Sequence, residues 1–278
     1  MTLSDNPHLA ATECSVLPLD AGDIHICQDG PRDAPALLLV HGSAASSTSW
    51  ELLVPLLAAS HHVIRIDLLG HGLSAKPLGG PGYDVAEQGR TVGQALDRLG
   101  VRQAIVVGHS SGGYSATALV ESRPELVSAL ALVNTGPGMD AYTAPDSFAI
   151  DPAHWPPTDE QIRLLASSGF REGYEIPQNL VDEVRELPLH AFGATLQAST
   201  AYLTERTLPE RLKGLGKPLQ VIFGDQDRRW RPASAADYEV VPGARIAMLP
   251  GAGHTPILEE PRRTAELLLE FTGLHTTR

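Results

Sequence analysis

The chain has 278 residues, of which 42% are hydrophobic and 19% charged, so it can bury a large core and is not disordered in composition. Its 33 acidic and 21 basic residues give a net charge of −12, which argues against binding to nucleic acid or to an anionic membrane. The N-terminal stretch has neither the basic start nor the long apolar run of a signal peptide, and no segment is apolar for long enough to span a membrane. We therefore expect a cytoplasmic protein.

The first predicted elements are two short strands, at 14–19 and 23–27, joined by a turn around Gly22. They carry the two cysteines of the chain, Cys14 and Cys27, which could face each other across a hairpin. Because disulfides are rare in cytoplasmic proteins, we expect two reduced thiols.

Strand and helix patterns alternate after this hairpin. Continuous apolar runs, typical of buried parallel strands, lie at 36–42, 61–72, 104–108 and 127–135. Helical patterns follow the first three of these runs, at 50–57, 84–100 and 114–125. This order predicts an α/β fold in which helices flank a mostly parallel sheet.

The alternation stops in a proline-rich segment, 137–216, which shows helical patterns, most clearly at 190–207, and no buried strand. A loop of this length without structure of its own would be uncommon in a compact domain. The strand and helix order then resumes with a strand at 219–225, a helix near 233–240, a strand at 244–251 and a last helix at 261–273. The sequence therefore predicts a core made of 1–136 and 217–278, with a helical lid, 137–216, inserted after the sixth strand.

A glycine-rich turn lies between the strand at 104–108 and the helix that follows it. Its sequence is Gly108-His109-Ser110-Ser111-Gly112, and only Ser110 fits the G-x-S-x-G frame. The second serine fails the frame because the residue two positions before it is a histidine. A strand, a sharp turn and a helix around this frame are typical of a nucleophilic serine with an exposed oxygen. Ser110 is therefore the candidate nucleophile.

A nucleophilic serine needs a base, and the base needs a group that orients it. Of the 11 histidines, His254 is the best candidate base, because it lies in a glycine-containing loop after the last predicted strand. Asp225 and Asp227 follow the preceding strand, and Asp227 is far enough from it to reach the neighbouring loop. We therefore expect the set Ser110, Asp227 and His254, with Asp225 as the alternative acid.

Five motifs together resemble the α/β-hydrolase fold superfamily over nearly the whole chain. They are LLLVHGSAASSTSW, IDLLGHGLSAKP, VVGHSSGGY, VIFGDQD and LPGAGHTPILEEP. The resemblance also favours Asp227 as the acid. It further implies an oxyanion hole formed by the backbone N–H groups of Ser43 and Ser111, of the kind that stabilises charge developing in acyl transfer.

For a chain that resembles this superfamily, a serine nucleophile implies a cofactor-free serine hydrolase acting through an acyl-enzyme on a carboxylic ester or lactone. The aromatic residues of the segment 137–216 favour a small, largely apolar substrate. A thioesterase or C–C bond hydrolase with the same residues, or a non-catalytic small-ligand receptor of this fold, are the alternatives. Trp155, Phe192 and Trp230 are candidate walls of the substrate pocket. We expect no metal, and no partner besides the small-molecule acyl substrate, in a monomer or a homodimer.

Overall fold

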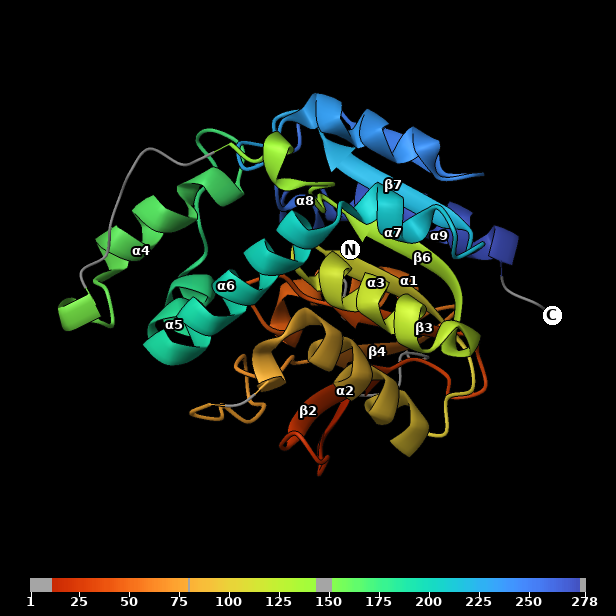
Figure 1. Cartoon of the computed structure of the whole chain (residues 1–278), viewed down its shortest axis with the longest axis horizontal. Helices are drawn as coiled ribbons and strands as arrows, with labels where there is room; N and C mark the ends of the chain where they lie inside the picture. The colour runs from red at the N-terminus through yellow and green to blue at the C-terminus, as the bar shows by residue number, and fades with distance from the viewer. Residues whose placement is uncertain (1–11, 80, 144–151, 276–278) are drawn as a thin grey trace, which may run out of the picture.

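The computed structural model of the chain describes residues 12–79, 81–143 and 152–275. Eight strands form one sheet in the order β1-β2-β4-β3-β5-β6-β7-β8 (Figure 1). The strands are β1 (Glu13–Leu17), β2 (Ile24–Asp29), β3 (Ala36–Val40), β4 (His62–Ile66), β5 (Ala104–His109), β6 (Val127–Val133), β7 (Leu219–Gly224) and β8 (Arg245–Leu249). Strands β3 to β8 pair in parallel, whereas β2 is antiparallel to both β1 and β4. The predicted fold class is confirmed.

Helices cover both faces of the sheet, and this explains why its central strands are apolar on both sides. The helices are α1 (Val54–Leu57), α2 (Val85–Arg98), α3 (Gly112–Ser122), α4 (Asp159–Ala166), α5 (Gln178–Glu186), α6 (Leu189–Glu205), α7 (Leu208–Leu212), α8 (Pro256–Glu259) and α9 (Pro261–His275). Alternate residues of one strand enter different cores. Val106 of β5 packs with α2 and α3, whereas Val107 packs with α1 and α9.

Two predicted helices differ from the structure. The pattern at 50–57 is split into a short 3-10 helix, η1 (Ser47–Trp50), and the single-turn α1. Pro55 explains the break, because proline has no N–H to donate and is tolerated only in the first turn of a helix. The pattern near 233–240 is also a 3-10 helix, η7 (Pro232–Val240), again with proline in its first turn.

The segment between β6 and β7 is helical, and its described residues form no strand. Figure 1 shows α4 and α5 standing to the left of the sheet, while α6 runs from α5 back to the sheet and towards α7, and it also contacts α2. A small apolar cluster holds α4 and α5 together; it contains Ile162, Phe170, Ile176, Val181 and Val184.

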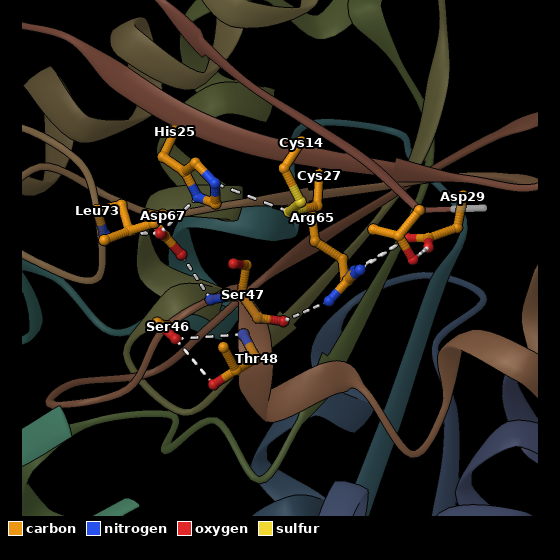
Figure 2. Close-up of a disulfide and its surroundings, with 11 residues drawn as sticks. Cys14, His25, Cys27, Asp29, Ser46, Ser47, Thr48, Arg65, Asp67 and Leu73 are labelled. Carbon is orange, nitrogen blue, oxygen red and sulfur yellow. Dashed lines mark hydrogen bonds and ion pairs between the residues drawn. A yellow bond between two sulfur atoms is a disulfide. The ribbon is translucent and has the colours of Figure 1, made fainter. Parts of the chain in front are cut away.

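The two cysteines are joined by a disulfide, so the expectation of reduced thiols is wrong (Figure 2). The antiparallel register of β1 and β2 places Cys14 directly opposite Cys27, with 4.1 Å between their Cα atoms. The expectation of reduced thiols came from the cytoplasmic compartment expected for the chain, whereas the geometry of the hairpin favours the disulfide. His25 lies beside the disulfide, and its Nδ1 lies 2.9 Å from a carboxylate oxygen of Asp67.

Asp67 connects this hairpin to the interior of the molecule. Its carboxylate accepts hydrogen bonds from the backbone N–H groups of Ser47, at 2.6 Å, and Leu73, at 2.9 Å (Figure 2). One buried carboxylate therefore fixes the edge of the sheet, η1 and the loop after β4 relative to one another. None of the helices in the described part of the chain is long and apolar enough to cross a membrane.

Candidate active site

Ser110 lies in the sharp turn between β5 and α3, in a backbone conformation that non-glycine residues rarely adopt. Its φ is 52°, and its amide donates to the carbonyl of Val133 on the neighbouring strand. The flanking glycines are required for close packing. A Cβ on Gly108 would lie 2.5 Å from the backbone of Gly113, and one on Gly112 would lie 2.3 Å from the carbonyl oxygen of His41. The turn thus holds the Ser110 hydroxyl outward at the end of the strand.

A chain of hydrogen bonds joins the three residues that the sequence selects. The Oγ of Ser110 lies 2.9 Å from Nε2 of His254, and Nδ1 of His254 lies 2.8 Å from Oδ2 of Asp227. His254 and Asp227 are both buried. The alternative acid, Asp225, is exposed and instead accepts a hydrogen bond from the amide of Gly251.

The carboxylate of Asp227 is surrounded by hydrogen-bond donors. Its Oδ1 accepts from the amides of Arg229, at 2.7 Å, and Trp230, at 3.1 Å. Its Oδ2 accepts from Nδ2 of Asn134, at 2.7 Å. Burial by itself would raise the pKa of Asp227, but the facing His254 and these hydrogen bonds hold that pKa below its ordinary value. The site therefore presents an ionised carboxylate to His254.

Asn134 is a site residue that sequence reasoning missed. It follows β6 with a φ of 44° and is fully buried. Its side chain accepts from the amide of Gly224 and donates to the carbonyl of Gly253 as well as to Asp227. It thereby joins the turn after β7 to the loop that carries His254. The available signal was an asparagine directly after a buried strand, a residue type enriched at positive φ.

His109, next to the nucleophile, contacts the loop that carries His254. Its Nε2 lies 2.9 Å from the carbonyl oxygen of His254, to which it can donate as a neutral imidazole. Burial, followed by the nearby His254, lowers the pKa of His109 to about 3. It is therefore neutral and does not compete with His254 for the Ser110 proton.

Ser43 and Ser111 lie side by side next to the nucleophile. Their hydroxyl oxygens are 2.8 Å apart and hydrogen-bond to each other. Within the described residues, neither of their backbone N–H groups donates to another protein group. A Cβ on Gly42, the residue before Ser43, would lie only 3.0 Å from the Cβ of Ser110, which shows how closely this turn approaches the nucleophile.

Comparison with known proteins agrees with this geometry. Residues 37–267 match the model of a family described as the alpha/beta hydrolase family. The chain belongs to the alpha/beta hydrolase family. This hydrolase is 27% identical over 269 residues to the Bacillus subtilis (strain 168) protein named "Putative 2-succinyl-6-hydroxy-2,4-cyclohexadiene-1-carboxylate synthase", covering 88% of this chain and 93% of that protein.

Two further relatives extend the comparison. The pimeloyl-[acyl-carrier protein] methyl ester esterase of Edwardsiella ictaluri is 29% identical over 261 residues, covering 89% of the hydrolase and 95% of the relative. The crystal structure of the enol-lactonase from Burkholderia xenovorans LB400 superposes with a TM-score of 0.77 at 23% identity, over 93% of the hydrolase and all of that chain. The structural likeness shows the shared fold.

A largely apolar cavity of about 430 Å³ opens onto Ser110 and His254 in this hydrolase. Residues from the core and from α4 to α6 contribute to its walls; among them are Tyr142, Ile162, Phe170, Phe192, Leu196 and Trp230. Phe192 and Trp230, two of the three candidate wall residues, line this cavity. Trp155 does not line the cavity: its ring stacks on Phe192, and its Nε1 donates to the carbonyl of Leu187. The stacked pair explains why only one of the two residues lines the cavity: Phe192 faces it, and Trp155 packs against the Phe192 ring.

Potential metal ligands come together at one place in the described parts of the hydrolase, the group Cys14, His25 and Cys27. The disulfide already occupies both sulfur atoms. This group lies at the sheet edge and forms no part of the cavity lining.

Proposed function

We propose that the chain is a serine hydrolase that cleaves a carboxylic ester or lactone of a small, largely apolar molecule through an acyl-enzyme. The observation that carries the proposal is the hydrogen-bond chain from Ser110 through His254 to Asp227 at the floor of an apolar cavity. The relative from Edwardsiella ictaluri, named as a methyl ester esterase, supports the same class of reaction.

Each group has a defined role in the proposed reaction. His254 takes the Ser110 proton as the Ser110 oxygen attacks the acyl carbonyl, and Asp227 stabilises the resulting imidazolium. The free N–H groups of Ser43 and Ser111 donate to the developing oxyanion. His254 then protonates the leaving alcohol, and later activates the water that releases the acid from Ser110.

The insertion 137–216 acts in this proposal as the lid of the site. Its helices supply much of the apolar wall of the cavity, including Phe192, and face Trp230 of the core. A closed apolar cavity excludes water and strengthens the hydrogen bonds to the oxyanion. We expect the lid to decide which ester fits, while the residues at the strand ends perform the chemistry.

Replacement of the nucleophile tests the proposal. Ser110→Ala should lower kcat/KM for phenyl hexanoate by about 10⁴- to 10⁶-fold, because it removes the hydroxyl that hydrogen-bonds to His254 and forms the acyl-enzyme. Ser111→Ala is the matched variant: it removes the neighbouring hydroxyl and keeps the amide, so its loss should be far smaller. Full activity in Ser110→Ala, or no turnover of esters, lactones or acyl thioesters by the wild-type protein, would contradict the proposal; the second result would favour a receptor.

A further inference from the structure

One permanently charged side chain lines the otherwise uncharged cavity. Among the described residues that form its wall, Arg229 is the single member of the Asp, Glu, Lys and Arg types. It follows the proposed catalytic Asp227 by two residues and belongs to the same cavity as Ser110. A guanidinium at this place can contact a molecule whose ester group is at Ser110.

The hydrogen bonds of Arg229 leave most of its guanidinium free. Its Nε donates to the hydroxyl of Ser168, at 3.2 Å, whereas its two Nη groups have no hydrogen-bond partner among the described residues and keep some exposure, since neither is a fully buried atom. No described carboxylate forms an ion pair with it. Asp227 does not form an ion pair with Arg229, because its two oxygens already bond to His254, Asn134 and two backbone amides.

Arg229 is half-buried, and the two buried arginines of the described chain show the usual arrangement for an enclosed guanidinium. Arg65, with a side chain 5% exposed, pairs with Asp29 at 3.0 Å. Arg211, also 5% exposed, pairs with Glu121 and Glu205. Both of these buried guanidinium groups are thus matched by carboxylates, as expected from the cost of burying an unpaired charge, whereas the half-buried Arg229 is not.

The surroundings of Arg229 disfavour its charged form but do not neutralise it. Burial lowers the pKa of Arg229 from its ordinary value, against the opposing effects of Tyr142 and Asp227. An arginine guanidinium nevertheless stays protonated in proteins. Its neighbours in space, Gly169 and Ser168, supply no negative charge. A positive group therefore faces an apolar cavity without a counter-ion of its own.

We propose that Arg229 forms a carboxylate-binding subsite, and that the preferred ester or lactone carries a carboxylate in addition to its scissile bond. The guanidinium fork fits a carboxylate with two parallel hydrogen bonds, and the Ser168 hydroxyl lies beside it. One cation in an apolar pocket balances a monoanion, so a carboxylate fits better than a phosphate dianion. This inference rests on the proposed function and narrows its substrate class.

Three matched esters test the subsite in steady-state kinetics. Phenyl hexanoate is neutral, monophenyl adipate has a carboxylate in its acyl half, and 4-carboxyphenyl hexanoate has one in its alcohol half. In the wild-type protein one of the acidic esters should have a kcat/KM at or above that of the neutral ester. Arg229→Gln should lower the ratio of acidic to neutral kcat/KM by about 10- to 100-fold, the usual range for a charged hydrogen bond. Arg229→Lys should keep part of the ratio.

Arg228→Gln is the matched control, because Arg228 is exposed and its Nη1 donates only to the carbonyl of Ser167. This variant should keep the wild-type ratio. A ratio that is the same in the wild type and Arg229→Gln, for both acidic esters, would overturn the subsite. A fall of the same size in Arg228→Gln would overturn it too, since the effect would then belong to the general charge of the surface.

Calorimetric binding to Ser110→Ala separates this proposal from the hydrolase proposal, since that variant cannot turn the esters over. It should bind the favoured acidic ester about 10- to 100-fold more tightly than phenyl hexanoate, and the double variant with Arg229→Gln should lose that preference. Preferential binding without any turnover by the wild-type protein would refute the hydrolase and retain the subsite. Equal binding of all three esters would overturn the subsite whatever the turnover.

Discussion

At the scale of single residues, the two aspartates after β7 show how position decides chemistry. Asp225 and Asp227 are two residues apart in one loop, yet only the second is buried beside His254. Asp225 faces solvent and caps the amide of Gly251. Both have the same intrinsic acidity, so their different roles come from the partners that the turn after β7 gives each of them.

We predict that Asp227→Asn lowers kcat by roughly 10⁴-fold, because an amide favours the wrong tautomer of His254 and cannot stabilise its imidazolium. Asp225→Asn is the matched control, and its kcat should stay within a few-fold of the wild type. Both values come from steady-state hydrolysis of phenyl hexanoate by variants with unchanged circular dichroism. A larger loss in Asp225→Asn than in Asp227→Asn would reverse the proposed assignment.

At the scale of elements, the sequence predicts regular patterns well and departures from them poorly. The four apolar runs are strands because a sheet covered on both faces needs such runs. The pattern at 84–100 gives α2, and Gly100 ends it with a φ of 70° while the amide of Val101 bonds to Leu96. The split at Pro55 and the 3-10 form of η7 were missed, because hydrophobic spacing hardly distinguishes a short helix from a longer one.

The candidate site residues also differ in how well the sequence predicts them. Ser110 is visible in a local motif, and His254 and Asp227 follow strands that the pattern identifies. Asn134 and Arg229 belong to no short motif. Their roles depend on β6 lying beside β7, and on which residues of the insertion cover the cavity. Such contacts between distant segments become visible only when the chain is folded.

The β1–β2 hairpin gives the prediction that belongs to this scale. The disulfide joins residues separated by 13 positions, and a closed loop of about this length stabilises a protein by roughly 3 kcal/mol in the chain-entropy model. Cys14→Ser combined with Cys27→Ser should therefore lower the free energy of unfolding in urea by up to about that amount. Wild-type protein reduced by a phosphine should behave alike, and the untreated protein should show no free thiol when unfolded. Equal stability of all three samples would contradict the prediction.

At the scale of the whole molecule, the parallel sheet assembles the site from distant parts of the chain. Ser110, Asn134 and Asp227 follow β5, β6 and β7, and His254 follows β8. The carboxyl ends of parallel strands lie at one edge of the sheet, where α/β proteins bind their ligands. The insertion leaves the sheet at this edge, after β6, and its helices line the cavity beside the nucleophile before the chain returns to the opposite edge, where β7 begins.

The same packing buries several histidines as neutral rings. Burial is the first cause that lowers the pKa of His71, and likewise that of His109, in each case to about 3. The unfolded chain, in contrast, binds these two protons near the ordinary histidine pKa of about 6.5. Each folded pKa is therefore below its unfolded value. The stability that these groups contribute is complete above about pH 6.5 and is lost as the pH falls from there towards 3.

We predict that the free energy of unfolding decreases steeply with acidification between pH 5.5 and 4.5, before most carboxylates are protonated. Each histidine that binds a proton only when unfolded contributes a slope of about 1.4 kcal/mol per pH unit, so His71 and His109 together give about 2.7. Urea unfolding at several pH values measures this slope. His71→Gln cannot take up the proton in either state, so its slope should be smaller by about 1.4 kcal/mol per pH unit, with little change in the contacts of the nucleophile. A flat wild-type profile, or a slope that His71→Gln leaves unaltered, would show that these rings do not stay neutral in the folded protein.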